Sequence, residues 1–285
     1  MRIFLFLFLF ACFLFSGCSN NAQFEQPVKA PTITSRVTEN KPQLTSTPFV
    51  EPSTTVNETI VPTERVVEVS SPLQEYSMTR LMDMISNPYH PPKSGSDDPH
   101  QGVDFSIVDP DYQIALAGEK VQSILEGEVV MVMNNRFPYG NSVMIETLFR
   151  DLPPGWVETL VEMPLPDSFG ISPALTCPSG WDKAPNDKPD LALYILYAHL
   201  HEPTAVEVNQ LVQSGEFLGS VGESGNALAP HLHVEMRYGY SRELNGSMAH
   251  YDVSASQEEM ENYCRWRVSG WYRVVDPLLF LKDVP

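Results

Sequence analysis

The sequence predicts a mostly β domain, an antiparallel sheet or sandwich with few short helices. Two observations indicate this class. Between residues 103 and 237 the apolar residues fall into short or alternating runs, a pattern typical of strands. Turn-forming residues separate almost every pair of runs, among them Gly118, Gly127 and Gly140. With 285 residues the chain has room for one sizeable domain and further segments outside it.

The first 18 residues have the features of an export signal. Arg2 is the only charge before an apolar run over residues 3–15, and Ser16-Gly17-Cys18 follows it. The run is short for a membrane span and ends in small residues of the kind a signal peptidase cleaves. Ser-Gly-Cys resembles a bacterial lipobox, although Phe15 departs from the usual aliphatic residue. We expect residues 1–18 to be a lipoprotein-type signal peptide, with the exported protein anchored to the membrane at Cys18 and facing the cell envelope; ordinary secretion is the alternative.

Residues 19–72 differ in composition from the rest of the chain. Pro, Ser, Thr, Asn, Val and Glu dominate this stretch, and recurrent prolines interrupt any apolar period. Such a segment buries too little apolar surface to offset the entropy lost on ordering. We expect a disordered tether that carries the domain, residues 73–285, away from the membrane.

Charge and cysteine content narrow the possible partners. The net charge is −18 and most of the acidic excess follows Pro72, without a basic stripe, which argues against nucleic-acid binding. After the leader only Cys177 and Cys264 remain. Because two cysteines in an exported protein usually pair, we expect a Cys177–Cys264 disulfide.

The elements of the domain are expected in the following order. Residues 74–85 fit one short helix, which the Ser86-Asn-Pro-Tyr89 turn would end. Strands are expected at residues 103–108, 120–125, 128–133, 142–148, 192–199, 216–221 and 231–237. No internal repeat is visible.

Histidines and one aspartate suggest a catalytic metal site. In an extended segment, His231, His233 and Glu235 share one face and Leu232, Val234 and Met236 the other. His100 and Asp104 flank Gly102, which would leave room for a bulky group between imidazole and carboxylate. Two histidines, one carboxylate and an open fourth position form a typical catalytic zinc set. His100, Asp104 and one histidine of the 231/233 pair satisfy it, while His199 and the other histidine would move a proton and stabilise an oxyanion.

These motifs resemble the lysostaphin-like zinc metallopeptidases, the LytM-type domain. The resemblance rests on His100-x-Gly-x-Asp104, Tyr197-Ala-His199-Leu200 and His231-Leu-His233 in this order. Ile85-Ser-Asn-Pro-Tyr89 and Val275-Asp-Pro-Leu278 are similar to the family's opening and closing segments. The resemblance implies the family's β fold, one Zn²⁺ per domain held by His100, Asp104 and His233, and His199 and His231 as catalytic residues that do not bind metal. It also implies cleavage of peptide bonds in peptidoglycan stems or cross-bridges.

The chain departs from the family by two insertions, at about residues 148–190 and 238–273, and each carries one of the two cysteines. Loops beside a site shape what it accepts. We therefore expect the insertions to influence substrate choice. Their tryptophans, Trp156, Trp181, Trp266 and Trp271, would either line a groove or form the insertions' own core.

Several alternatives remain at this level. Glu235 could support the histidine pair or be a solvated acid, and His90, His201 and His250 are interpreted as surface residues. Some domains of this type lack ligands and activate a separate wall hydrolase, so a non-catalytic regulator is the second hypothesis; a metal-dependent carbohydrate binder or esterase is a third. The complete ligand set favours the peptidase.

Overall fold

The computed structural model describes residues 67–91, 93, 95–163, 175–182 and 190–282. The predicted signal peptide, Cys18 and most of the predicted tether lie outside them. Residues 67–72, expected to be the end of the tether, contact the domain: Val67 and Val69 pack against its core, and the Ser70 amide donates to the Ile124 carbonyl at 2.9 Å. The domain therefore begins before residue 73. No helix in the described part of the chain is both long and apolar enough to cross a membrane.

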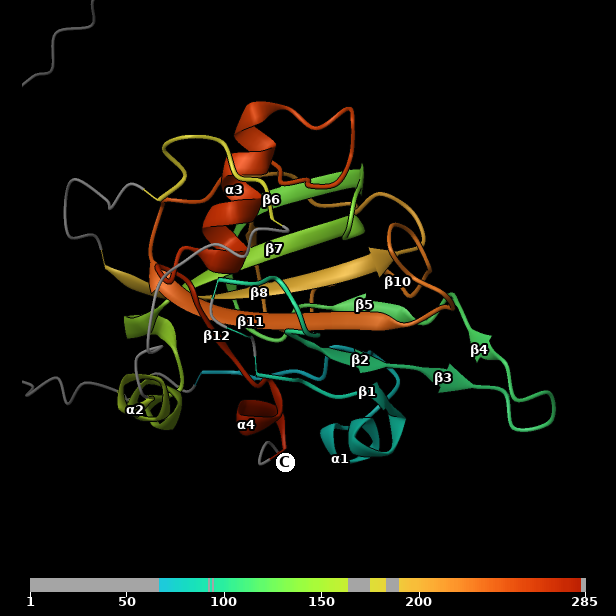
Figure 1. Ribbon diagram of the computed structural model, residues 1–285. Helices are drawn as coiled ribbons and strands as arrows, with labels where there is room; N and C mark the ends of the chain where they lie inside the picture. The colour runs from blue at the N-terminus through green and yellow to red at the C-terminus, as the bar shows by residue number, and fades with distance from the viewer. Residues whose placement is uncertain (1–66, 92, 94, 164–174, 183–189, 283–285) are drawn as a thin grey trace, which may run out of the picture. The chain divides into compact units, whose positions relative to one another are not determined.

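One large antiparallel sheet dominates the domain (Figure 1). Its strand order is β1-β2-β11-β8-β7-β6-β9, and β12 pairs with the second half of β11. These strands are β1 Ile85–Asn87, β2 Val103–Phe105, β6 Gly127–Arg136, β7 Gly140–Leu148, β8 Leu191–Leu200, β9 Leu211–Val212, β11 Leu232–Tyr240 and β12 Arg273–Val275. Two small sheets pair β5 (Lys120–Gln122) with β10 (Phe217–Ser220) and β3 (Ile107–Val108) with β4 (Ala115–Leu116).

The predicted fold class is thus confirmed, and every expected strand run contains a strand. The run over residues 103–108 divides into β2 and β3, because the Ser106 amide between them donates to the Met84 carbonyl instead of a neighbouring strand. Strands β8 and β11 are long and their mutual register has no shift, so their side chains alternate between the two faces of the sheet.

Helices are few and short. They are α1 Met78–Leu81, α2 Pro154–Glu162, α3 Gln257–Val268 and α4 Leu278–Leu281, with 3₁₀ turns at Met82–Met84 and Phe149–Asp151. The predicted helix over residues 74–85 is wrong in length: it begins only after the Ser77 cap and ends where Ile85 pairs with Phe105. The insertions, expected to be loops, contain α2 and α3. A capping box between Ser256 and Glu259 starts α3.

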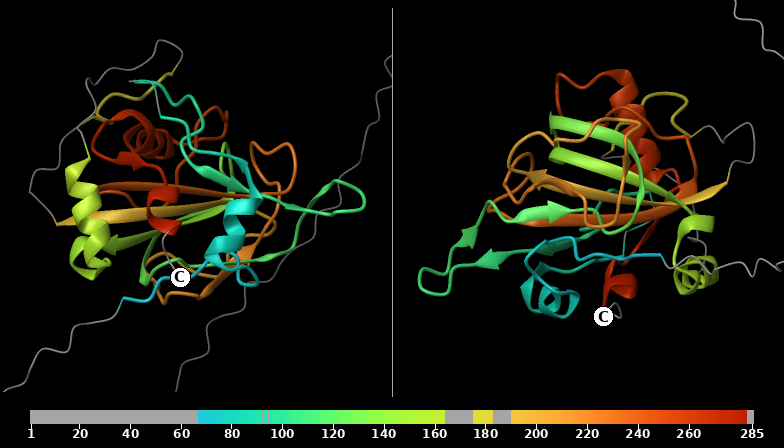
Figure 2. Two further views of the ribbon diagram at one scale, coloured as in Figure 1. Left: turned by 90° about the horizontal axis from the view of Figure 1, so that it is seen from below. Right: turned by 180° about the vertical axis from the view of Figure 1, so that it is seen from behind.

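The two faces of the sheet have separate cores. Leu193, Ile195 and Tyr197 of β8 point into one core, whereas Tyr194 and Leu196 point into the other. Helices α1, α2 and α4 cover the first face and α3 lies over the second (Figures 1 and 2). Leu232, Val234 and Met236 of β11 belong to the first core. His233 of β11 therefore faces the side that carries α3, as the alternation predicts.

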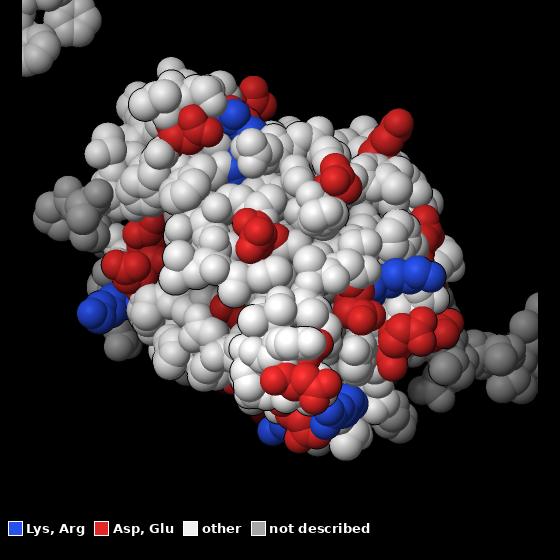
Figure 3. All heavy atoms as spheres, turned by 90° about the vertical axis from the view of Figure 1, so that its right-hand side faces the viewer, with Lys and Arg blue, Asp and Glu red and all other residues white. Residues whose placement is uncertain are grey.

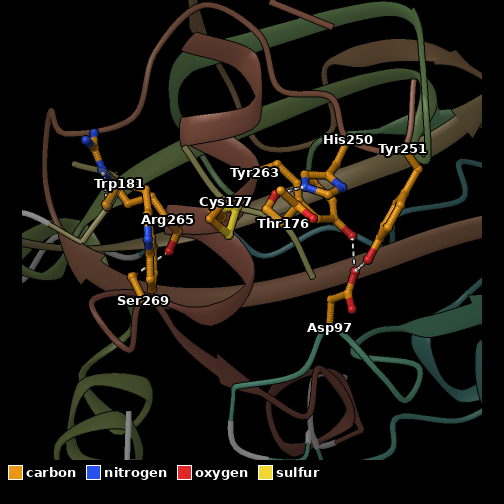
Figure 4. Close-up of a disulfide and its surroundings, with 10 residues drawn as sticks. Asp97, Thr176, Cys177, Trp181, His250, Tyr251, Tyr263, Arg265 and Ser269 are labelled. Atoms are coloured by element: carbon orange, nitrogen blue, oxygen red, sulfur yellow. Dashed lines mark hydrogen bonds between the residues drawn. A yellow bond between two sulfur atoms is a disulfide. The ribbon is translucent and has the colours of Figure 1, made fainter. Parts of the chain in front are cut away.

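The two insertions meet above this second face. The predicted disulfide between Cys177 and Cys264 is present and joins them (Figure 4). Trp266 is fully buried in the second core, against Tyr194 and Tyr272. We call the described residues 175–182 and 241–272 the inserted lobe.

The surface agrees with the acidic composition. On the described residues of the face in Figure 3, acidic side chains are scattered among uncharged ones and the basic side chains form no continuous stripe.

Candidate metal centre

Three side chains that are far apart in sequence converge at the end of the sheet where β2 meets β11. Asp104 on β2 lies opposite His233 on β11 in the strand register, and His100 precedes β2. Asp104 Oδ1 is 3.0 Å from His100 Nε2 and 2.8 Å from His233 Nδ1, and the two nitrogens are 3.0 Å apart. The structure thus brings together the three predicted ligands.

The hydrogen bonds around this cluster direct its free electron pairs inward. His100 Nδ1 is 3.0 Å from the Pro88 carbonyl, so we assign the ring proton to Nδ1 and leave a lone pair on Nε2. That lone pair faces a carboxylate oxygen, and a cation held between these two acceptors would satisfy both. Asn87 Nδ2 donates to the other carboxylate oxygen, Oδ2, at 3.1 Å. Two imidazole nitrogens and one carboxylate oxygen are ligands that Zn²⁺ prefers, so the residues present fit this metal.

The electrostatics of Asp104 support the same conclusion. Burial raises the pKa of this carboxyl, but the neighbouring His100 and His233 lower it more, to well below its usual range. The group is therefore an anion at any physiological pH. Because an anion is the form that binds a cation, the site is prepared for one.

Gly102 allows the ligands to approach. A Cβ at this position would lie 2.6 Å from His233 Cε1 and 2.6 Å from the Val234 carbonyl. The space that the sequence predicts beside Gly102 therefore holds the His233 imidazole, and a larger residue would push β11 away from β2.

His199 and His231 complete the set of histidines. His199, at the end of β8 with a φ of 64°, places Nδ1 2.7 Å from the Ser224 carbonyl, and His231 Nδ1 is 2.8 Å from the Ala229 carbonyl. Each ring therefore keeps Nε2 as its proton-accepting atom. The two ring centroids are 4.8 Å apart, and His231 Nε2 lies 3.6 Å from Asp104 Oδ1. Burial, and then the neighbouring His233 and His231, lower the pKa of His199 to about 3, so its ring is neutral.

The cluster opens into a cleft of about 770 Å³. The loop before His100 and the turn at Phe137 and Pro138 form part of its wall. The second insertion adds Tyr251, Tyr263 and Arg267. The expectation that an insertion shapes the site is met by the second one, whereas no described residue of the first lines the cleft.

A buried carboxylate lies behind His233. Glu235 is fully buried, and its Oε2 is 3.5 Å from His233 Nε2, the ring nitrogen that points away from Asp104. Burial lowers the pKa of His233, but Asp104 and Glu235 raise it more, to about 9. Of the two interpretations offered by the sequence, the solvated acid is wrong and the supporting role is favoured.

Other sequence expectations turn out differently. Trp156 packs on Phe280 beneath the sheet and Trp266 fills the second core, so the insertions' tryptophans do not line this cleft. Trp181 and Trp271 border a separate hollow of about 590 Å³. His90 and His201 are exposed as predicted. His250 is not: it is 4% exposed and stacks on Tyr263, because its ring fills the core of the inserted lobe.

Some residues near the site could not be found from sequence motifs. Tyr139 donates to Glu235 Oε2 at 2.9 Å, and Arg267 donates to the same oxygen at 2.9 Å. Neither residue lies within one of the histidine motifs, and Arg267 belongs to an insertion. Only Glu235 carried a usable signal, its position on the histidine face of the strand.

Comparison with known proteins gives a family for part of the chain. Residues 188–246 match the model of Peptidase family M23. The matched segment holds His199, His231 and His233, so the family that the motifs indicate is confirmed there. His100 and Asp104 lie outside the match, and their membership of the cluster comes from the structure. No protein of curated function matches the sequence closely enough to count as a relative.

Solved structures give similar chains at low identity. Lysostaphin from Staphylococcus simulans is 20% identical over 77% of this chain and 55% of its own, with a TM-score of 0.37. The catalytic domain of the prophage-encoded M23 protein EnpA from Enterococcus faecalis is 17% identical over 56% of this chain and 85% of its own, with a TM-score of 0.33. A zinc-containing peptidase from Vibrio cholerae is 17% identical over 70% of this chain and 36% of its own, also with a TM-score of 0.33.

Proposed function

Residues 188–246 of this chain match Peptidase family M23. We propose that the protein is a zinc-dependent endopeptidase that hydrolyses peptide bonds in peptidoglycan stems or cross-bridges. The observation that carries the proposal is the convergence of His100 Nε2, Asp104 Oδ1 and His233 Nδ1 on one point, with His199 and His231 beside it. A regulator that had lost catalysis would not need this complete set.

The residues divide into two groups by their contacts. His100, Asp104 and His233 would hold one Zn²⁺, which when bound supplies Lewis-acid chemistry that activates water and polarises a carbonyl. His199 and His231 lie next to each other beside this cluster, where they would flank a bound substrate. Because their Nδ1 atoms are directed to backbone carbonyls, both can accept a proton at Nε2 and return it to the leaving amine. Burial keeps His199 neutral, so its Nε2 presents a lone pair, but the lowered pKa makes this ring a weak base.

Digestion of purified peptidoglycan tests the proposal. The zinc-loaded protein is expected to release peptide fragments, to stop when a chelator removes the metal, and to resume when Zn²⁺ is restored. Mass spectrometry of the fragments would name the bond. A folded, zinc-loaded protein that releases nothing, yet stimulates a separate wall hydrolase, would contradict the peptidase and establish the regulator.

We also infer that the protein is exported and anchored at Cys18. The support is the apolar run over residues 3–15 followed by Ser16-Gly17-Cys18. An anchored domain on a long tether would reach substrate beyond the membrane surface. Mass spectrometry of the mature N-terminus is expected to show a lipidated Cys18, and an unmodified residue at that terminus would contradict the anchor.

A further inference from the structure

The support of the metal centre extends beyond the strands that carry the ligands. If His233 binds metal through Nδ1, its Nε2 carries the ring proton. Among the described residues Nε2 has no hydrogen-bond partner, and Glu235 Oε2 at 3.5 Å is the carboxylate oxygen that faces it. A carboxylate opposite the outer nitrogen of a metal-binding histidine fixes the orientation of the ring and raises its basicity.

Glu235 is itself held from two sides. Arg237 on the same strand donates from Nε to Oε1 at 2.6 Å, and Arg267 on α3 donates from Nη1 to Oε2 at 2.9 Å. All three side chains are nearly or fully buried. Arg237 comes with the strand that carries His233, whereas Arg267 comes from the second insertion.

Arg267 also reaches the segment that leads to His100. Its Nη2 donates to the carbonyl of Asp97, three residues before His100. Two tyrosines of the same insertion donate to the Asp97 side chain: Tyr251 Oη lies 2.7 Å and Tyr263 Oη 2.9 Å from Oδ2 (Figure 4). One guanidinium therefore joins the carboxylate behind His233 to the loop in front of His100.

We propose that Arg267 is a positioning residue through which the second insertion orients two of the three metal ligands. It acts on His233 through Glu235 and on His100 through Asp97. The inserted lobe is then part of the metal site and not only a wall of its cleft. This inference rests on the proposed metallopeptidase function, whose ligand set it extends.

Two arginines on α3 allow a positioning role at the metal site to be distinguished from a purely structural role in the lobe. Arg265 lies on the same helix and is also held by backbone carbonyls, those of Trp181 and Glu243, but it makes no contact with the ligands or with Glu235. Both Arg267→Met and Arg265→Met should lower the melting temperature. Only the first should change the metal site.

The measurement is metal affinity of the full, disulfide-intact chain. Metal-free wild type, R267M, R267K and R265M would be titrated with Co²⁺, following its visible absorption, and with Zn²⁺ in competition with a chelating dye. R267M is expected to bind about 10- to 100-fold more weakly and to shift the Co²⁺ spectrum, the range for losing an outer partner of a metal ligand. R267K should lose part of this affinity, because one ammonium cannot span Glu235 and Asp97 as a guanidinium fork does. R265M should match the wild type.

The outcomes are distinguishable. Wild-type affinity in R267M, or an equal loss in R265M, would overturn the positioning role and leave the proposed function intact. A wild type that binds neither metal would overturn the metal site and both proposals. If R267M does not fold, the folded R267K variant decides, and wild-type affinity there would overturn the inference.

Discussion

The ligand strands and the inserted lobe meet at the cleft but are stabilised in different ways. Strand β11 is paired residue by residue with β8 on one side and with β2 and β12 on the other. The lobe has few main-chain hydrogen bonds to the sheet, chiefly those of Gly246 with β6, and is otherwise held by a buried aromatic cluster and arginine contacts. A disulfide and several side-chain hydrogen bonds join its two parts.

This difference indicates how each region contributes to the site. Backbone pairing fixes the positions of Asp104 and His233 with little dependence on neighbouring side chains. The lobe influences them only through a small number of contacts, chiefly Arg267. Changes in the lobe should therefore weaken the site by degrees, whereas loss of a ligand should abolish its chemistry while the sheet persists.

The largest effect is expected from replacing a ligand. His233→Ala removes a nitrogen from the centre and should lower peptidase activity by at least about 10⁴-fold, the scale for losing a member of a catalytic unit. The main-chain pairing of β11 is retained, so circular dichroism should stay close to wild type. Hydrolysis of peptidoglycan and bound zinc per chain are the measurements.

His201→Ala is the matched control, since His201 is exposed and lies two residues after His199. It should keep both activity and zinc. A His233→Ala variant with full zinc and full activity would contradict the assignment of this ligand.

The second effect concerns the disulfide. Cys177 and Cys264 are 87 residues apart, and the chain-entropy estimate for a loop of this length is about 4–5 kcal/mol. In a Cys177→Ala/Cys264→Ala variant the inserted lobe should open before the sheet does. Hydrogen exchange is expected to speed up in α3 while β8 and β11 remain protected, with partial loss of metal affinity through Arg267.

Wild type under reducing conditions should reproduce this behaviour, and wild type under oxidising conditions is the control. If α3 and the sheet lose protection together, the two regions unfold as one cooperative unit and the comparison between them fails.

The same contrast explains what the sequence could predict. The ligand face of β11 follows from alternation, and the runs around His100 and His199 show local strand and turn chemistry. Spacing left open which histidine of the 231/233 pair binds metal. His233 is favoured, because its Nδ1 lies 2.8 Å from Asp104 Oδ1, whereas His231 Nε2 lies 3.6 Å away. The cysteine pairing was predictable because only two cysteines follow Cys18.

The contacts of the inserted lobe could not be predicted from such sequence patterns. Arg267 contacts Glu235 and Asp97, which are distant from it in the sequence, and no local sequence periodicity indicates these contacts. His250 looked like a surface residue because nothing in its neighbourhood shows that Tyr263 would stack on it. Helix α3 did carry a signal, the Ser256-x-x-Glu259 capping box, although its polar composition masks the helix.

The smallest effect concerns the seam between β6 and α3, where Arg136 donates to Glu259 at 2.7 and 2.8 Å. Partial burial raises the pKa of Glu259, but hydrogen bonds from the Ser256 amide and from Arg136 outweigh it, so the pKa lies below its ordinary value of 4.5. A carboxyl whose pKa is lowered in the folded state stabilises the fold at pH values above its unfolded-state pKa. It loses that contribution as the pH falls through its folded-state pKa.

Glu259→Gln should therefore lower the free energy of unfolding by less than about 1 kcal/mol at neutral pH and leave it unchanged in acid. Melting temperatures between pH 3 and pH 7, beside the exposed neighbour Glu258→Gln, would measure this, and an equal or pH-independent loss in both variants would show that the ion pair does not hold the seam.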